Sequence, residues 1–177
     1  MAIHKFAMLF KNLEKNLGKE AALQIFPEYA TLPEKMGAEE QAALARRVMD
    51  RMDESLDREK IVKIRRGNVC NLPKEQRREM TELMRKCKDI DEFLTAYGYV
   101  KQEDGAYLSN FKRQPKCYCG LFKKLENYEP ISITWCECCN GHHEKGLREV
   151  CGQPVKTEIV ESISSGGGNC VTRVSVL

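Results

Sequence analysis

The sequence has no apolar run long enough to cross a bilayer. A membrane-spanning helix needs about 18 or more consecutive apolar residues, and the longest candidate near the N-terminus, residues 6–10, is far shorter. The same run is too short for the core of a secretory signal peptide, which takes about 7–15 residues. We therefore expect a cytoplasmic protein that has no membrane contact and works in a reducing compartment.

Nucleotide-binding and hydrolase motifs are missing as well. The chain contains no G-x-G-x-x-G, G-x-x-x-x-G-K-[ST], H-E-x-x-H or G-x-S-x-G. Its glycine triplet, residues 166–168, lies between two predicted strands, so it lacks the helix N-terminus that would favour a phosphate. Neither sign of charge dominates, because 29 basic and 26 acidic residues give a net charge of +3. Composition alone therefore does not demand a nucleic-acid partner.

Apolar residues recur at helical spacing through the first part of the 177-residue chain. The predicted buried positions are Phe6, Leu9, Phe10, Leu13 and Leu17; Leu23, Ile25 and Phe26; Leu44, Val48, Met52 and Leu56; and Met80, Leu83, Met84 and Cys87. Gly18 is expected to end the first helix and Pro73 to begin the fourth, while Asp89 and Glu92 resemble the capping box of a short last helix. We predict a helical region over residues 1–114.

A basic stretch interrupts this helical region. Residues 58–78 contain eight basic residues against two acidic ones, a balance that could bind phosphates or nucleic acid. The stretch has no interleaved aromatic residues for base stacking and no helix-turn-helix or zinc-finger spacing around it. We expect a solvated helical face rather than a nucleic-acid site.

Apolar residues alternate with polar ones in the second part of the chain. This period of two predicts strands at residues 131–135 and 155–159, and a third strand over 171–177 after a glycine-rich turn. A helix is expected between the first two strands. The chain is thus predicted to be α+β, with a helical N-terminal part packed on a small antiparallel sheet and a strand–helix–hairpin unit over 115–177, either as a second domain or as part of a single one.

Cysteine is abundant, and it is concentrated in the second part. Seven of the nine cysteines lie after residue 100, and five of them share 27 residues with two histidines. Thiolate and imidazole are ligands that suit zinc, which usually takes four of them. We therefore predict a zinc site. Its candidate ligands are Cys117, Cys119, Cys136, Cys138, Cys139, His142, His143 and Cys170.

The cysteine spacing leaves alternatives open. C-x-C followed by C-x-C-C matches no standard zinc module, and adjacent ligands at Cys138 and Cys139 cannot easily bind one ion. Redox-active thiols are the second interpretation and ordinary packing the third. Cys70, Cys87 and Cys151 stand alone in the sequence, so we expect each to be a small buried hydrophobe.

Three segments carry a resemblance to known families. They are Thr134 to His143 (TWCECCNGHH), Gly152 to Val155 (GQPV) and Ile159 to Cys170 (IVESISSGGGNC). They are similar to a group of cysteine-rich bacterial proteins, some of which are named L-2-amino-thiazoline-4-carboxylic acid hydrolase-like. More remotely, the layout resembles 4-vinyl-reductase-type domains, which are α+β modules that bind small molecules. The resemblance covers residues 115–177.

The likeness to 4-vinyl-reductase-type domains implies a zinc ion held by cysteines around the helix and the hairpin. Cys136 and Cys170 match two of those positions, whereas Ser162 stands where a third cysteine is typical. The remaining candidate ligands would have to compensate for it. The hydrolase name brings no catalytic motif that can be placed on this chain.

Two functional classes follow from these patterns. The first is a zinc-stabilised domain that binds a small apolar or sulfur-containing molecule, in the role of a sensor. The second is a hydrolase for a small C–N or thiazoline-type substrate, using a metal-activated water or a cysteine thiolate beside His142 or His143. Glu137 and Glu144 are candidate general bases, although surface exposure is the simpler expectation for both. We expect a homodimer and no nucleic-acid partner.

Overall fold

The computed structural model describes residues 2–67, 73–109 and 116–177. Helices come first in the chain: α1 (Ala2–Leu17), α2 (Lys19–Ile25), η1 (Pro27–Thr31), α3 (Ala38–Ser55), α4 (Arg58–Arg66), α5 (Lys74–Lys86) and α6 (Ile90–Ala96). The sheet and its helix follow: β1 (Tyr99–Lys101), β2 (Tyr107–Ser109), η2 (Ile133–Cys136), α7 (Glu137–Cys151), β3 (Val155–Glu161), η3 (Ile163–Ser165) and β4 (Val171–Val176). Among all the described residues, no helix is long and apolar enough to cross a membrane.

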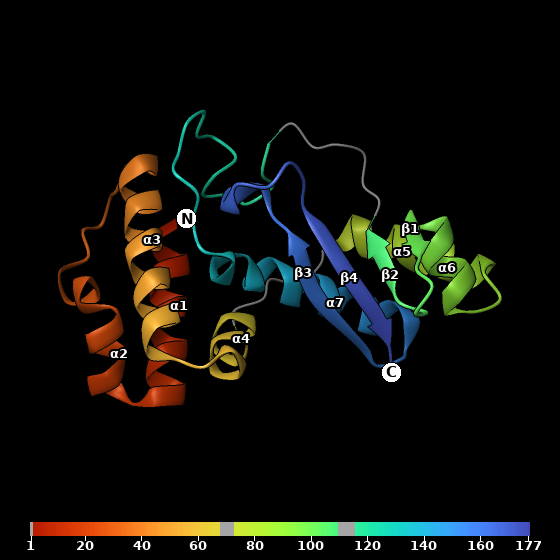
Figure 1. Ribbon diagram of the computed structural model, residues 1–177, viewed down its shortest axis with the longest axis horizontal. Helices are drawn as coiled ribbons and strands as arrows, with labels where there is room; N and C mark the ends of the chain where they lie inside the picture. The colour runs from red at the N-terminus through yellow and green to blue at the C-terminus, as the bar shows by residue number, and fades with distance from the viewer. Residues whose placement is uncertain (1, 68–72, 110–115) are drawn as a thin grey trace.

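The four strands form one antiparallel sheet in the order β1-β2-β4-β3. The predicted α+β arrangement is confirmed, since β3 and β4 pair as the predicted hairpin and α7 packs against β3. In Figure 1, α7 runs from the block of α1, α2 and α3 to the sheet and passes behind β3 and β4. The helix ends at Gly152, whose φ of 65° is the left-handed conformation that glycine adopts most readily.

The described residues form two hydrophobic cores. The first core contains residues of helices α1, α2, α3 and α4, together with Cys117, Cys119, Phe122 and Trp135. The second joins α5, α6, α7 and all four strands. Each core therefore draws residues from both sides of residue 115. Whether residues 115–177 form a separate domain stays a prediction.

The predicted strand at residues 131–135 is wrong. Ser132 accepts a hydrogen bond from the Thr134 amide at 3.2 Å, which starts the 3-10 helix η2 that leads directly into α7. Asp53 on α3 binds the hydroxyls of both Ser132 and Thr134. Neighbouring residues Thr134 and Trp135 are both buried, which a strand with alternating faces would not allow.

Strands β1 and β2 were not predicted from the sequence. Each has three residues, too few to show an alternating pattern. The signal that could have found them is the Asp104–Gly105 pair between two tyrosine-containing segments, because Asp-Gly is typical of tight hairpins. Gly105 has the positive φ, 81°, that such a turn requires.

Candidate functional site

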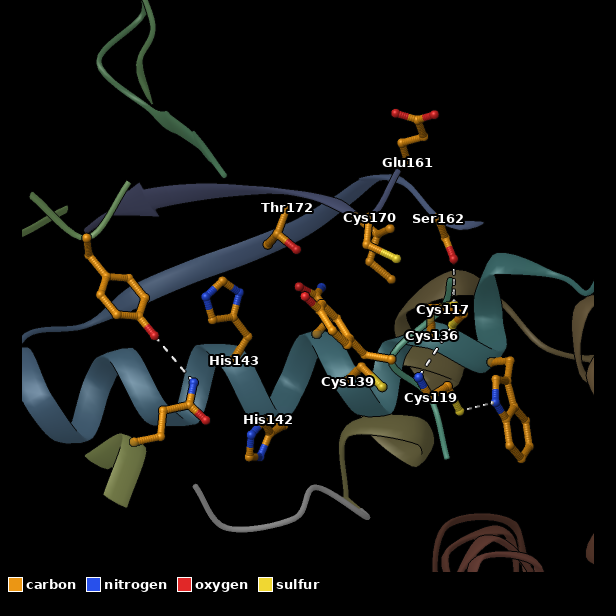
Figure 2. A pocket seen from close by; sticks show the side chains of 16 residues that line it. Cys117, Cys119, Cys136, Cys139, His142, His143, Glu161, Ser162, Cys170 and Thr172 are labelled. Carbon is orange, nitrogen blue, oxygen red and sulfur yellow. Dashed lines mark hydrogen bonds between the residues drawn. The ribbon is translucent and has the colours of Figure 1, made fainter. Parts of the chain in front are cut away.

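A cavity of about 470 Å³ opens where the two cores meet. Its walls come from α7, from the turn between β3 and β4, and from the Cys117–Cys119 segment (Figure 2). We call it the thiol pocket. Seven of the eight predicted ligands line it: Cys117, Cys119, Cys136, Cys139, His142, His143 and Cys170. Cys138 is half-buried beside the pocket and is not among its lining residues.

The first pair of thiols in the pocket is Cys117 and Cys170. Cys117 is buried, 6% exposed, and Cys170 is half-buried at the start of β4. Interaction between the two thiols raises the pKa of Cys117 and lowers that of Cys170. Cys170 therefore ionises first, and a thiolate on it is held by the neighbouring thiol.

The second group of thiols joins Cys119 to α7. The thiol of Cys139 interacts with both Cys119 and Cys138, and this interaction lowers the pKa of those two residues and raises that of Cys139. The Nε1–H of Trp135 donates to the sulfur of Cys119 at 3.4 Å. The positive charge of Lys5 acts in the same direction on the pKa of Cys119. This wall of the pocket thus favours a thiolate at Cys119.

Cys136 is hydrogen-bonded to hydroxyl groups rather than to thiols. Its sulfur lies 3.0 Å from both Ser162 Oγ and Ser164 Oγ, and burial raises its pKa. Ser162 also interacts with the thiol of Cys170. The serine hydroxyl therefore lies between two of the pocket's sulfurs.

The two histidines lie away from the thiols. Figure 2 shows Cys117, Cys119 and Cys136 at one end of the pocket and His143 at the other, while His142 lies on the side of α7 opposite the strands. His143 is hydrogen-bonded to the hydroxyl of Tyr99, and their rings stack 5.8 Å apart. Burial lowers the pKa of His143 to about 4, so the imidazole is neutral at pH 7.

The sequence predicts Glu137 and Glu144 to be exposed, and this expectation is wrong. Glu137 is 1% exposed and is bound by Arg58 and Arg66. Glu144 accepts from Arg66 at 2.6 Å and from the Thr157 amide at 2.9 Å. We call these five residues the carboxylate network. Both carboxylates hold α7 against α4 and β3, and neither lines the thiol pocket.

The expectation of a solvated basic face is wrong for part of residues 58–78. Arg65 is 3% exposed, lies 4.6 Å from the Trp135 ring and donates to the Trp135 carbonyl at 2.7 Å. Arg66 enters the carboxylate network. These arginines fasten α4 to η2 and α7, because a buried guanidinium needs both a charge partner and hydrogen-bond acceptors. Arg77 and Arg78 are exposed, as predicted.

The other isolated cysteines lie away from the pocket. Cys87 and Cys151 are half-buried and pack against the second core, as small hydrophobes do. Cys70 lies outside the described residues.

Among the pocket residues that sequence reasoning missed is Asn140. It is 3% exposed, and its Nδ2 donates to the Thr157 carbonyl at 3.3 Å. Its Oδ1 has no hydrogen-bond partner among the described residues. A buried carbonyl oxygen is costly without a partner. No pattern in the sequence marks it.

The thiols of the pocket are ligands that suit a soft metal, although they lie in separate groups. Across residues 2–67, 73–109 and 116–177, no three or more His, Cys, Asp or Glu side chains are arranged as a group that could hold a metal ion. The thiols of Cys117 and Cys170 influence each other's pKa, as do those of Cys119 and Cys139. The fold does not bring either histidine to these sulfurs.

Fold and site together define a cysteine-rich α+β protein with a thiol-lined pocket between two cores. The chain belongs to the family described as "Family of unknown function (DUF6144)", which matches residues 2–177. No curated protein and no solved structure matches the chain.

Proposed function

We propose that this chain is a small-molecule-binding domain in which pocket thiols hold a zinc ion. One observation carries the proposal: five cysteines from three separate segments line a single cavity. Buried cysteines that serve only for packing have no reason to converge on a cavity wall. Thiolates are the ligands that zinc and other soft metals prefer.

Cys117, Cys119, Cys139 and Cys170 are the residues that would hold the ion. Cys136 is the least suited of the pocket cysteines, because two serine hydroxyls already bind its sulfur. A zinc ion held by these four cysteines would act as a structural link between the two cores. The small molecule would occupy the rest of the cavity.

The test is to purify the reduced protein, measure its zinc content, and compare thermal unfolding before and after chelation. Because the free energy of binding a metal adds to that of folding, we expect about one zinc per chain and a clear fall in Tm on chelation. The Cys87→Ser/Cys151→Ser variant, changed only outside the pocket, serves as the control and should behave as wild type. An unchanged Tm after metal removal would rule the zinc site out.

A second candidate function is thiolate hydrolysis of a small C–N or thiazoline-type substrate. The observation in its favour is Cys170, half-buried in the pocket wall, whose pKa is lowered by the Cys117 thiol. A thiolate at neutral pH is a nucleophile. The assay is ring opening of L-2-amino-thiazoline-4-carboxylate by the metal-free protein, and Cys170→Ser should abolish any activity found.

A further inference from the structure

His143 occupies the end of the thiol pocket opposite Cys117, Cys119 and Cys136 (Figure 2). Its imidazole points from α7 towards the strands, where Thr172 also lines the cavity. What this end of the cavity binds is therefore decided by side chains other than the thiols.

Tyr99 fixes the position of the imidazole. Its hydroxyl is hydrogen-bonded to His143 Nε2, and the two ring planes lie at 16° with their centroids 5.8 Å apart. Tyr97, which also lines the cavity, stacks on Tyr99 with its ring centroid 6.1 Å away. The imidazole is thus held in one orientation before any ligand binds, which lowers the entropic cost of binding.

The second ring nitrogen of His143, Nδ1, has no hydrogen-bond partner among the described residues. Within that part of the chain, Asn140 Oδ1 and Ser165 Oγ are the only unpartnered side-chain N or O atoms that are fully buried. Nδ1 is consequently accessible, and His143 lines the cavity, so this atom can form a hydrogen bond with a molecule inside it. In a neutral imidazole one nitrogen donates and the other accepts, so a ligand group that can do both suits either tautomer.

The cavity offers no counter-charge at this end. Glu161 is the only Asp, Glu, Lys or Arg among the described residues that line it. Its carboxylate points away from His143 in Figure 2 and accepts hydrogen bonds from the amides of Gly168 and Asn169 at 2.6 and 3.2 Å. A charged ligand would lose its hydration there without compensation, whereas the rings of Tyr97 and His143 favour a flat aromatic ring.

We propose that the His143 end of the thiol pocket binds an uncharged aromatic molecule whose carboxamide, or a comparable polar group, is hydrogen-bonded to Nδ1. This inference rests on the proposed function, because it names the class of small molecule that the same cavity takes. It differs from that function in using none of the thiols.

Three probes of similar size separate the properties that the ligand requires. Benzamide is uncharged and aromatic, benzoate has the same ring with a negative charge, and cyclohexanecarboxamide has the same amide without the aromatic ring. NMR titrations of the reduced full chain give a Kd for each probe. We expect benzamide to bind about five-fold more tightly than either of the others, or better, with intermolecular NOEs from its ring to the imidazole protons of His143.

Two variants test the hydrogen bond to Nδ1. His143→Phe keeps an aromatic ring and removes Nδ1, so the Kd for benzamide should rise about five-fold. His4→Phe makes the same change at an exposed position of α1 and should leave the Kd unchanged. The comparison of probes and the NOEs use wild-type protein, so they decide the question even where His143→Phe fails to fold.

The outcomes separate this inference from the zinc site, because zinc content is measured on the same samples. Equal affinity for the three probes, or NOEs to Trp135 instead of His143, overturns the inference, while bound zinc leaves the zinc site standing. Selective binding of benzamide at His143 by protein that takes up no zinc supports the inference and removes the zinc site. Protein that binds neither zinc nor benzamide overturns both.

Discussion

Two groups of polar side chains flank helix α7, and they differ in how completely they are satisfied. In the carboxylate network, Glu137 and Glu144 are each bound by arginine, and Thr157 adds two further hydrogen bonds. In the thiol pocket, the sulfurs interact mainly with one another and line an open cavity. The carboxylate network, whose hydrogen bonds are satisfied within the protein, holds helices and strands together. The thiols of the pocket remain available to a ligand.

The difference assigns separate roles to residues that are neighbours in sequence. Glu137 and Cys139 are two positions apart on α7, yet one is 1% exposed and the other faces the cavity. Changes in the network should therefore alter stability, and changes in the pocket should alter binding. The four predictions below test that division, from the largest effect to the smallest.

Glu137→Gln should destabilise the fold by about 3 kcal/mol, because it leaves the guanidiniums of Arg58 and Arg66 without their buried carboxylate. Urea unfolding at pH 7 measures the change. Glu158→Gln is the matched control, since its pair with Lys156 is exposed on both sides and should change stability by less than about 1 kcal/mol. Equal effects of the two variants would contradict the structural role of the network.

Acid should destabilise the protein through His143. Its pKa is about 4 in the folded chain against 6.5 for an ordinary histidine, so the unfolded state binds the proton first. Stability is complete above pH 6.5 and falls by up to about 3 kcal/mol as the pH drops to 4. His143→Gln should lose this part of the pH dependence and His4→Gln, at an exposed position, should keep it. Parallel urea-unfolding curves for both variants across this range would refute the assignment.

Trp135→Phe should cost about 1 kcal/mol, because it keeps an aromatic ring in the core but removes the N–H donated to Cys119. It should also make Cys119 harder to ionise, which the pH dependence of its alkylation by iodoacetamide reports. Phe122→Leu changes a ring beside Trp135 but no donor, so its alkylation profile should match that of wild type. A profile for Trp135→Phe that matches wild type would show that the donor does not act on the thiol.

Cys139→Ser should change the stability of the metal-free protein by less than about 0.5 kcal/mol, since the side chain is exposed at the cavity. Metal retention should nevertheless fall. Urea unfolding and equilibrium dialysis of the same samples separate the two effects. A large loss of stability without metal would place Cys139 in the scaffold instead of the site.

Sequence patterns predicted a helix or strand correctly where the residues of that element alone determine its conformation. The hairpin of β3 and β4 follows from its alternating residues, and α7 ends where Gly152 permits a left-handed turn. Residues 131–135 also alternate, but Asp53, far away in the chain, binds Ser132 and Thr134 and stabilises a helical turn. A hydrogen bond to a residue so distant in the sequence cannot be predicted from the alternation of residues 131–135.

The site was predictable in its composition and not in its arrangement. The clustered cysteines and histidines predicted seven residues that do line one cavity, five cysteines and two histidines. The division of the C-x-C thiols between Cys170 and Cys139 depends on how the β3–β4 turn packs over α7. Burial of Glu137 depends likewise on arginines about 70 to 80 residues earlier in the chain. The spacing of residues in the sequence predicts neither the contacts of the cysteines nor those of Glu137.

The most direct test of the central claim is a native-state count of reactive thiols by Ellman's reagent, with and without stoichiometric zinc. If the pocket thiols hold the metal, zinc should protect about four of the nine cysteines in wild type. Protection should fall in Cys117→Ser/Cys170→Ser and persist in Cys87→Ser/Cys151→Ser. Equal reactivity of all thiols with and without zinc would contradict the account.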